Sequence, residues 1–323
     1  MEVEVSEKPP SGWNDFLLSQ TSGNFYQSTF YADYAQAEIG FKPFYFSVVG
    51  GGSTVAQLLV FESCKYYGLK FRPGYSVFYP LVKLFFKQLH WVYGPVCSEE
   101  KYAVALLDKV KSFSQEKKIK IAGSSAFPLN DFKEVSIQAG FQRENKATFV
   151  VDLSLSEEEL WKNVDKSARK LVNRTLEDVN VRIIESVEDF KSYCLVLNEN
   201  RVRSKLAKVP YSEELWRVFS ESNSGCFFIA EKDGNVLAGL GVSFFNGFLN
   251  EWGAATSSSA LEEKIYAGDA IKWEVIKWGR HKGFRFFDLS GVSPEPKTEK
   301  EKGIFRFKEK WGGRLVSYGE YSL

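Results

Sequence analysis

Residues that bind metals or form disulfides are scarce in this sequence of 323 residues. It has 2 histidines and 4 cysteines, and no two cysteines form a CxxC pair. A structural zinc site needs clustered Cys and His ligands, so we expect no metal site. Isolated cysteines in a chain of this length are typical of buried thiols in a reducing compartment, which favours a cytoplasmic location.

An excess of charge of one sign is also missing. The sequence has 42 Lys and Arg against 41 Asp and Glu, a formal net charge of +1. This balance excludes a globally basic protein that coats nucleic acid, although a local basic surface stays open. No signal-peptide pattern and no apolar run of about 18 residues occurs. We therefore expect a cytoplasmic protein with no integral membrane segment, and peripheral contact with a membrane stays open.

The common catalytic signatures are missing as well. The sequence has no GxxxxGK[ST] phosphate loop, no GxGxxG after a strand, no HExxH and no GxSxG. These absences give no support to a nucleotide-binding, zinc-peptidase or serine-hydrolase function. We expect the chain to work without a cofactor.

A pattern of hairpin, strand, helix and strand occurs twice along the chain. A strand, a glycine-containing turn and a second strand are predicted at 44–61 and again at 226–244. The other elements of each copy, a strand, a helix and a short buried strand, are predicted at 91–94, 104–110 and 119–122 and at 250–253, 271–278 and 284–288. The repeat predicts two α/β domains with mixed sheets, residues 1–146 and 147–323. Whether the C-terminal tail packs back on the first domain stays open.

A basic stripe is predicted on a helix that begins near Ser156. Apolar residues from Trp161 to Thr175 share one helical face. The opposite face carries five cations: Lys162, Lys166, Arg169, Lys170 and Arg174. Such a stripe is either an ordinary solvated surface or a phosphate-binding surface for tRNA, because like charges repel one another unless an anion neutralises them.

The C-terminal segment carries the most specific pattern. Residues 287–292 read Phe-Asp-Leu-Ser-Gly-Val, and residues 302–313 read Lys-Gly-Ile-Phe-Arg-Phe-Lys-Glu-Lys-Trp-Gly-Gly. A strand that ends in Asp-x-Ser-Gly, followed by Gly-Ile-x-x-Phe-Lys-x-x-Trp-Gly-Gly, resembles the ending of the Fem (FemABX) family. These non-ribosomal peptidyltransferases add amino acids from aminoacyl-tRNA to peptidoglycan precursors.

Shorter segments extend the resemblance over residues 13–321. They are Phe-Tyr-Gln-Ser at 25–28, Gly-Pro-Val at 94–96, Leu-Trp at 160–161 ahead of the basic stripe, and Leu-Ala-Gly at 237–239. The resemblance implies two tandem domains of the GNAT (N-acetyltransferase-like) fold, without the coiled-coil arm of some members. It also implies an aminoacyltransferase that takes an amino acid from aminoacyl-tRNA and adds it to an amine of a peptidoglycan-type precursor peptide.

Aminolysis of an activated ester mainly needs positioned reactants and stabilisation of the oxyanion. Lys308, which matches a family lysine, is the candidate for stabilising that charge. The acceptor amine must lose a proton, and Glu251 and Asp288 are the candidate bases. The candidate substrate-binding residues are two arginines that could grip a diphosphate and three aromatic residues: Arg201, Arg203, Tyr211, Trp252 and Phe307. Surface-helix, turn-capping and core roles are the structural alternatives for these residues.

Two other functions stay open. GNAT domains commonly use acyl-CoA and hold its pyrophosphate at a [RQ]xxGx[GA] loop. Residues 265–270, Ile-Tyr-Ala-Gly-Asp-Ala, keep the Gly and the last Ala but lack the Arg or Gln, and Asp269 would repel a pyrophosphate. The chain could instead be an inactive relative that binds tRNA or a glycan.

Overall fold

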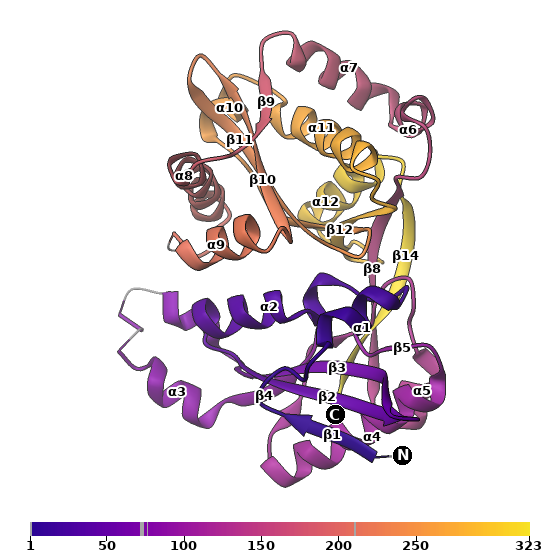
Figure 1. Ribbon diagram of the computed structural model, residues 1–323. Coiled ribbons are helices and arrows are strands. Elements are labelled where there is room, and N and C mark those ends of the chain that lie inside the picture. The colour runs from indigo at the N-terminus through magenta and orange to yellow at the C-terminus, as the bar shows by residue number, and fades with distance from the viewer. Residues whose placement is uncertain (1, 72–73, 76, 210) are drawn as a thin grey trace. The chain divides into compact units, whose positions relative to one another are not determined.

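The chain forms two compact units in a computed structural model that describes residues 2–71, 74–75, 77–209 and 211–323. The first unit contains residues 1–147 and 316–323, and the second contains residues 148–315. Both boundaries lie inside strands, namely β8 (Gln142–Asp152) and β14 (Arg314–Ser322) (Figure 1). The C-terminal tail therefore belongs to the same compact unit as the N-terminal residues.

The first unit is built on a mixed sheet with strand order β1-β2-β3-β4-β6, in which β4 and β6 are parallel and β5 pairs with β3. Its strands are β1 (Glu2–Ser6), β2 (Lys42–Gly50), β3 (Ser53–Cys64), β4 (Lys87–His90), β5 (Val96–Cys97), β6 (Lys120–Ile121) and β7 (Ser124–Ser125). Its helices are α1 (Trp13–Ser19), η1 (Phe25–Gln27), α2 (Thr29–Tyr34), η2 (Ala35–Ile39), η3 (Tyr67–Phe71), α3 (Tyr79–Phe85), α4 (Glu100–Lys117) and α5 (Lys133–Gln138).

Alternating side chains of β2 explain why this sheet is covered on both faces. Phe44 and Phe46 both contact Phe113 of α4, with ring centroids 5.0 and 5.4 Å apart. Tyr45 points the other way and contacts Trp13 of α1 at 4.9 Å. Because successive strand residues face opposite sides, the nearly continuous apolar run of β2 is buried on both faces.

Two of the short family-like segments meet in the first unit. Gln27 lies in the buried Phe-Tyr-Gln-Ser segment, and its side-chain amide donates to the carbonyl of Val92 at 2.7 Å. Asn24 donates to the carbonyl of Tyr93 at 2.8 Å. A Cβ at Gly94 would lie 2.5 Å from Leu58, so glycine is the residue that fits beside this clamp.

The prediction of a strand at 91–94 is wrong, because the clamp formed by Gln27 and Asn24 holds this segment in a non-strand conformation. The neighbouring strand β4 covers Lys87–His90 and ends there. The carbonyls of Val92 and Tyr93 bond the side chains of Gln27 and Asn24, and Tyr93 has a φ of 53°. A β ladder is interrupted where backbone carbonyls accept from side chains, and also where a residue is left-handed.

The second unit contains the strand order β14-β8-β13-β12-β11-β10-β9, in which β12 and β13 are parallel. Its further strands are β9 (Asn180–Ile183), β10 (Gly225–Lys232), β11 (Asn235–Phe245), β12 (Phe248–Thr256) and β13 (Phe286–Val292). Its helices are α6 (Glu157–Asn163), α7 (Lys166–Leu176), α8 (Val187–Arg203), α9 (Glu213–Glu221), α10 (Ser258–Glu262), α11 (Ala267–His281) and α12 (Glu299–Glu309). The predicted α/β class with mixed sheets is confirmed.

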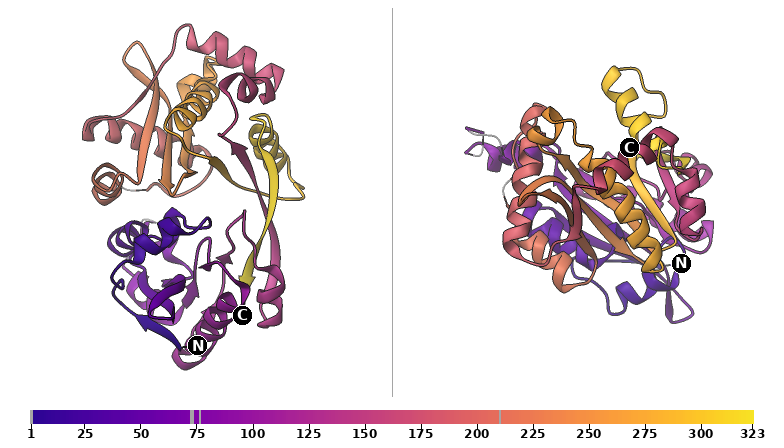
Figure 2. Two further views of the ribbon diagram at one scale, coloured as in Figure 1. Left: turned by 45° about the vertical axis from the view of Figure 1, so that its right-hand side comes forward. Right: turned by 90° about the horizontal axis from the view of Figure 1, so that it is seen from above.

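Helices cover both faces of this second sheet. Phe227 of β10 contacts Phe190 of α8 at 4.6 Å, whereas its neighbour Phe228 contacts Trp278 of α11 at 5.4 Å. Adjacent strand residues face opposite sides, so α8 and α11 lie on opposite faces (Figures 1 and 2). The layers place the first turn of α11 beside β11 and β12, where the candidate site lies.

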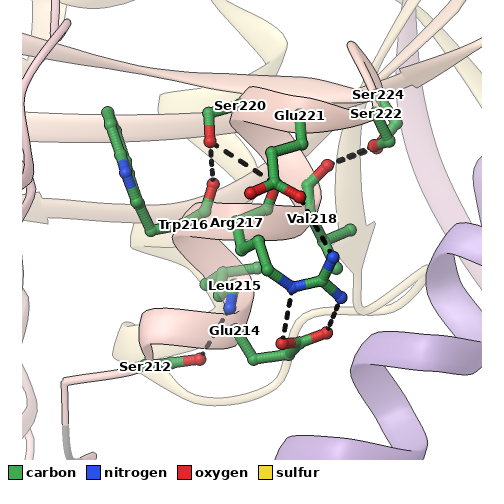
Figure 3. A network of polar contacts seen from close by, with 10 residues as sticks. All are labelled: Ser212, Glu214, Leu215, Trp216, Arg217, Val218, Ser220, Glu221, Ser222 and Ser224. Carbon is green, nitrogen blue, oxygen red and sulfur yellow. Dashed lines mark hydrogen bonds and ion pairs between the residues drawn. The ribbon is translucent and has the colours of Figure 1, made fainter.

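Local hydrogen bonds fix the ends of the shorter helices, as α9 illustrates (Figure 3). The hydroxyl of Ser212 accepts from the backbone N–H of Leu215 at 2.9 Å and caps the helix. Arg217 pairs with Glu214 and with Glu221 on the exposed side. An N-terminal serine cap typically stabilises a helix by about 1 kcal/mol, whereas exposed i,i+3 and i,i+4 pairs add less.

The prediction that one helix carries the basic stripe is wrong, because the chain forms two helices there, α6 and α7. The break falls at Val164 and Asp165, where both residues leave the helical conformation. The Asp165 carboxylate accepts from the N–H of Ser167 at 2.7 Å and caps α7. The N–H of Asp165 donates to the carbonyl of Lys310 at 2.8 Å, a tertiary contact that replaces the bond of a continuous helix.

No helix among the described residues is both long enough and apolar enough to cross a bilayer.

Candidate active site

The candidate site lies where the parallel pairing between β12 and β13 ends. Their parallel pairing joins residues 248–250 to residues 286–288, and β12 then continues beside β11 alone. The β11–β12 ladder shifts register between Leu240 and Gly241, which leaves Gly253 as an extra residue with a φ of 66°. A bulge of this kind bends the strand and opens space next to it.

Asp288 organises the end of β13. Its side chain is fully buried and accepts hydrogen bonds from the hydroxyl of Thr148, the amide of Asn250 at 3.3 Å and the N–H of Ser290 at 2.8 Å. Ser290 has a φ of 65°, a conformation that costs energy for a residue with a side chain. The hydroxyl of Ser290 donates to the carbonyl of Glu251 at 2.9 Å, so the bonds around Asp288 hold this turn against β12.

Lys308 of α12 reaches this turn. Its ammonium donates to the carbonyls of Ser290 and Gly291 at 3.1 and 3.2 Å. Burial lowers the pKa of Lys308 and Lys272 lowers it further, whereas Glu251 and Asp288 oppose the shift. The structure therefore brings the three predicted catalytic residues, Lys308, Glu251 and Asp288, into one electrostatic cluster.

A buried lysine that sequence reasoning missed completes the cluster. The side chain of Lys272 is 2% exposed and forms an ion pair with Glu251, which is 10% exposed. Its ammonium also lies 5.2 Å from the ring centroid of Phe287. The available signal was its spacing in the sequence, because Lys272 stands three and four residues before Val275 and Ile276 on the apolar face of α11.

The start of α11 is occupied by a carboxylate of the chain itself. Asp269 lies in the first turn, is 5% exposed and pairs with Lys310, the residue directly after α12. Burial raises the pKa of Asp269, and the Lys310 ammonium opposes this effect. Lys310 also lies 4.2 Å from the ring centroid of Phe307. The pair ties α12 to the helix end at which GNAT domains commonly hold a pyrophosphate.

Two glycines explain how the chain directly after α12 can pack closely against α6 and β8. A Cβ at Gly312, which has a φ of 74°, would lie 2.7 Å from Asn163. A Cβ at Gly313 would lie 3.1 Å from the backbone of Val150. The Trp-Gly-Gly end of the family-like segment thus packs closely on α6 and β8 of the same unit, with Trp311 only 1% exposed.

A cavity of 150 Å³ adjoins the cluster. Its lining includes Gly268 and Lys272 of α11, Ala254 and Thr256 of β12, and Phe307 of α12. Pockets for drug-sized ligands usually measure about 300–1,000 Å³. This volume suits a small acyl or aminoacyl group.

The two candidate diphosphate-binding arginines hold parts of the chain itself. Arg201 donates to the carbonyl of Ala207 at 2.7 Å. Arg203 donates to the carbonyl of Thr256 at 2.7 Å and to Ser258 at 3.1 Å. The two guanidinium groups therefore bond different segments. Arg203 also lines an open cavity of 890 Å³ between α8, the β10–β11 turn and α10.

The three candidate aromatic residues are separated. Tyr211 contacts Phe190 at 5.5 Å and lines an apolar cavity beside α8. Trp252 packs edge-on against Phe219 at 5.6 Å. Phe307 is the one of the three that lines the cavity beside Lys272.

The basic stripe remains largely exposed after the helix breaks in two. Lys162 lies on α6, and the other four cations lie on α7. Arg174 stacks over the ring of Tyr266 at 5.5 Å, and Arg169 donates to the carbonyl of Trp161 at 3.4 Å. Glu159 interacts electrostatically with Lys162 and Asp165 with Arg169, but none of the five cations forms an ion pair within 4.0 Å of a described carboxylate. The stripe therefore keeps charge that a phosphate could neutralise.

Reversal of Lys166, Arg169 and Arg174 to Glu should weaken binding of tRNA or of a phosphate-bearing precursor. If all three contact phosphates, the slope of log affinity against log salt should become shallower by about 3. The unfolding free energy should change little, because these side chains lie outside the buried face. Filter binding across a salt series and a thermal melt measure both quantities.

Charge reversal of Lys109, Lys118 and Lys120, which are exposed in the first unit, is the matched control. Equal loss of affinity in both triple variants would show that only net charge matters. Unchanged binding in the stripe variant at low salt would leave the stripe as ordinary solvated surface.

In the described part of the chain, no three His, Cys, Asp or Glu side chains are arranged to hold a metal ion. No family model matches the sequence, and no curated protein is significantly similar to it.

Solved structures do match the fold. A FemX crystal structure superposes over 98% of this chain and 96% of its own with a TM-score of 0.75, at 14% sequence identity. The chain has the fold of FemX. The L-PGS structure from Bacillus licheniformis matches over 99% of this chain and 92% of its own, with a TM-score of 0.58 at 15% identity.

A tandem GNAT protein from the clavulanic acid biosynthesis pathway matches over 99% of this chain and 98% of its own, with a TM-score of 0.54 at 11% identity. The tandem GNAT-like fold implied by the sequence resemblance is therefore confirmed. At these identities the likeness concerns the fold, and the chemistry has to be argued from this chain's own residues.

Proposed function

We propose that this chain is an aminoacyltransferase that moves an amino acid from aminoacyl-tRNA to an amine of a peptidoglycan-type precursor peptide. The observation that carries the proposal is the position of Lys308, whose half-buried ammonium lies at the parting of β12 and β13. The fold of FemX and the family-like C-terminal segment that contains Lys308 support the same assignment.

The reaction needs little chemistry from the protein. The acceptor amine attacks the ester carbonyl carbon, a tetrahedral oxyanion forms, and the bond to the ribose oxygen of the tRNA breaks. The proton that the amine gives up balances the one that the leaving oxygen gains. A positioned cation stabilises the oxyanion, and fixed donors of this kind act most strongly where water is excluded.

Lys308 suits this role for two reasons. Its two carbonyl partners use two of the three ammonium hydrogens, so a third remains to be donated to a substrate oxygen. Burial lowers its pKa, which makes the ammonium a better proton donor to a developing alkoxide.

Both carboxylates are better suited to positioning than to accepting the amine's proton. The oxygens of Asp288 accept from three groups that shape the Ser290 turn. Protonation of Glu251 would leave the ammonium of Lys272 buried without its counter-charge, which is costly. We therefore propose that the proton given up by the amine ends on the leaving ribose oxygen. Lys308 and groups of the substrate itself carry it there.

The structure weighs against acyl-CoA as donor. A CoA pyrophosphate at the first turn of α11 would meet the carboxylate of Asp269. Lys310 is already paired with that carboxylate. The helix end thus lacks the free positive charge that a pyrophosphate needs.

Donor use is directly testable with the purified chain, a peptidoglycan-type pentapeptide precursor and labelled donors. We expect label to move from aminoacyl-tRNA to the peptide amine, and deacylated tRNA to compete while free CoA does not. Scintillation counting of the separated peptide, with mass spectrometry of the product, measures the transfer.

Transfer from acyl-CoA alone would replace the proposal with the N-acyltransferase function. Binding of tRNA with no transfer to any peptide amine would favour the inactive relative.

A further inference from the structure

The first unit exposes an apolar patch that its own core does not explain. The patch lies on α3 and the residues around it and consists of Tyr75, Val77, Phe78, Leu81, Leu84, Phe85 and Phe86. The exposed fractions reach 78% for Val77 and 74% for Phe85. Isolated exposed apolar residues are normal, but a contiguous group of this kind marks an interaction surface.

The sequence around the patch carries positive charge alone. No Asp or Glu occurs between Glu62 and Glu99. The same stretch contains five cations: Lys65, Lys70, Arg72, Lys83 and Lys87. Because the whole chain is nearly neutral, this stretch is a local departure from its composition.

The contacts of these lysines leave much of their charge in place. Lys83 donates to the carbonyl of Gly40 at 3.1 Å, and Lys70 donates to the carbonyl of Glu38 at 2.9 Å. A carbonyl orients an ammonium group without cancelling its charge. Lys87 pairs with Glu62, and Lys65 lies 5.5 Å from the ring centroid of Tyr66.

We propose that this patch docks the protein on the surface of an anionic lipid bilayer. Interfacial segments combine Leu, Phe and other apolar residues on one side with lysines that reach the headgroups. Tyrosine rings, as at Tyr66 and Tyr75, suit the boundary between acyl chains and headgroups. The segment lies on the surface, because α3 has only seven residues and is far too short to span.

A lipid surface fits this composition better than a protein partner does. Protein interfaces are depleted in lysine and favour arginine among the cations, whereas four of the five cations in this stretch are lysines. Each lysine near an anionic leaflet contributes attraction without a specific partner. This inference concerns a surface separate from the transfer chemistry, so its failure would leave the proposed function untouched.

Flotation with vesicles tests the proposal on the full chain. We expect binding to vesicles of phosphatidylcholine and phosphatidylglycerol in equal amounts, weak binding to phosphatidylcholine alone, and a steep loss of binding as NaCl is raised. Leu81→Ser with Phe85→Ser should lower the partition coefficient about tenfold or more for each side chain. Lys65→Gln with Lys83→Gln should lower it about fivefold for each lysine.

The matched control is Leu195→Ser with Leu261→Ser, which removes two exposed leucines from the second unit. All four positions are exposed, so thermal melts should be unchanged. No binding of the wild type to the anionic vesicles at low salt would overturn the proposal, and so would equal losses in the patch and control variants. Self-association in sedimentation that Leu81→Ser with Phe85→Ser abolishes, without vesicle binding, would assign the patch to a second copy of the chain.

Discussion

Replacement of Lys308 by alanine should lower kcat about 10²–10³-fold and leave the affinity for the ground-state substrates nearly unchanged, because loss of one oxyanion-stabilising group typically has this effect. The ammonium lies at the Ser290 turn, where it can meet charge that develops in the transition state. Single-turnover rates with labelled aminoacyl-tRNA, together with equilibrium binding of each substrate, measure the two quantities separately.

The arginine variant adds a pH readout. Burial lowers the pKa of Lys308, so activity that needs its ammonium should fall on the alkaline side below the pH at which an ordinary lysine titrates. Lys308→Arg should rescue the rate poorly, because a planar guanidinium cannot replace a compact ammonium between two carbonyls. Its residual activity should lack that alkaline fall, because arginine stays protonated.

Lys302→Ala and Lys310→Ala are the controls for general loss of charge. Lys302 pairs with Glu299 on the exposed side of α12 and should be almost neutral. Lys310→Ala should mainly affect stability through Asp269. Equal losses of kcat in all three variants would end the catalytic assignment of Lys308.

Replacement of Lys272 by methionine should destabilise the second unit by about 3–5 kcal/mol, because it leaves the carboxylate of Glu251 buried without its partner. The double variant Lys272→Met with Glu251→Gln should recover most of that loss, since it removes both charges. Denaturant unfolding followed by tryptophan fluorescence is suited to this test. Of the 8 tryptophans, only Trp13 and Trp91 lie in the first unit.

Lys277→Met is the matched control on the same helix. Lys277 pairs with Glu274 at 2.7 Å, but both side chains are about one quarter exposed, so the loss should stay within about 1 kcal/mol. If Lys272→Met and Lys277→Met unfold at the same denaturant concentration, the buried pair does not hold the second unit together.

The sequence by itself predicted the elements whose signal is local. The hairpins at 44–61 and 226–244 formed because alternating apolar residues flank glycine-containing turns. The helices now seen as α4 and α11 followed from apolar residues at helical spacing. The family-like ending also made Lys308 a candidate for the catalytic role, because its neighbours in the chain carry the pattern.

Local patterns failed where a distant segment supplied the decisive bond. Residues 91–94 have the composition of a strand, but Asn24 and Gln27 bond their carbonyls from almost 70 residues away. The basic helix breaks at Asp165, whose N–H bonds the carbonyl of Lys310. Sequence periodicity is evaluated over a short stretch of neighbouring residues, and none of these hydrogen-bond partners lies within that stretch.

The candidate site depended most on tertiary structure. Lys272 reads as one more cation on a helix, and only the packing of α11 on the sheet buries it against Glu251. Asp288 reads as a strand-end acid, and only Thr148 and Asn250, from two other strands, turn it into a fixed acceptor. Sequence determines which charges exist, whereas burial determines which of them must be paired, because an unpaired charge is costly only after water has been removed.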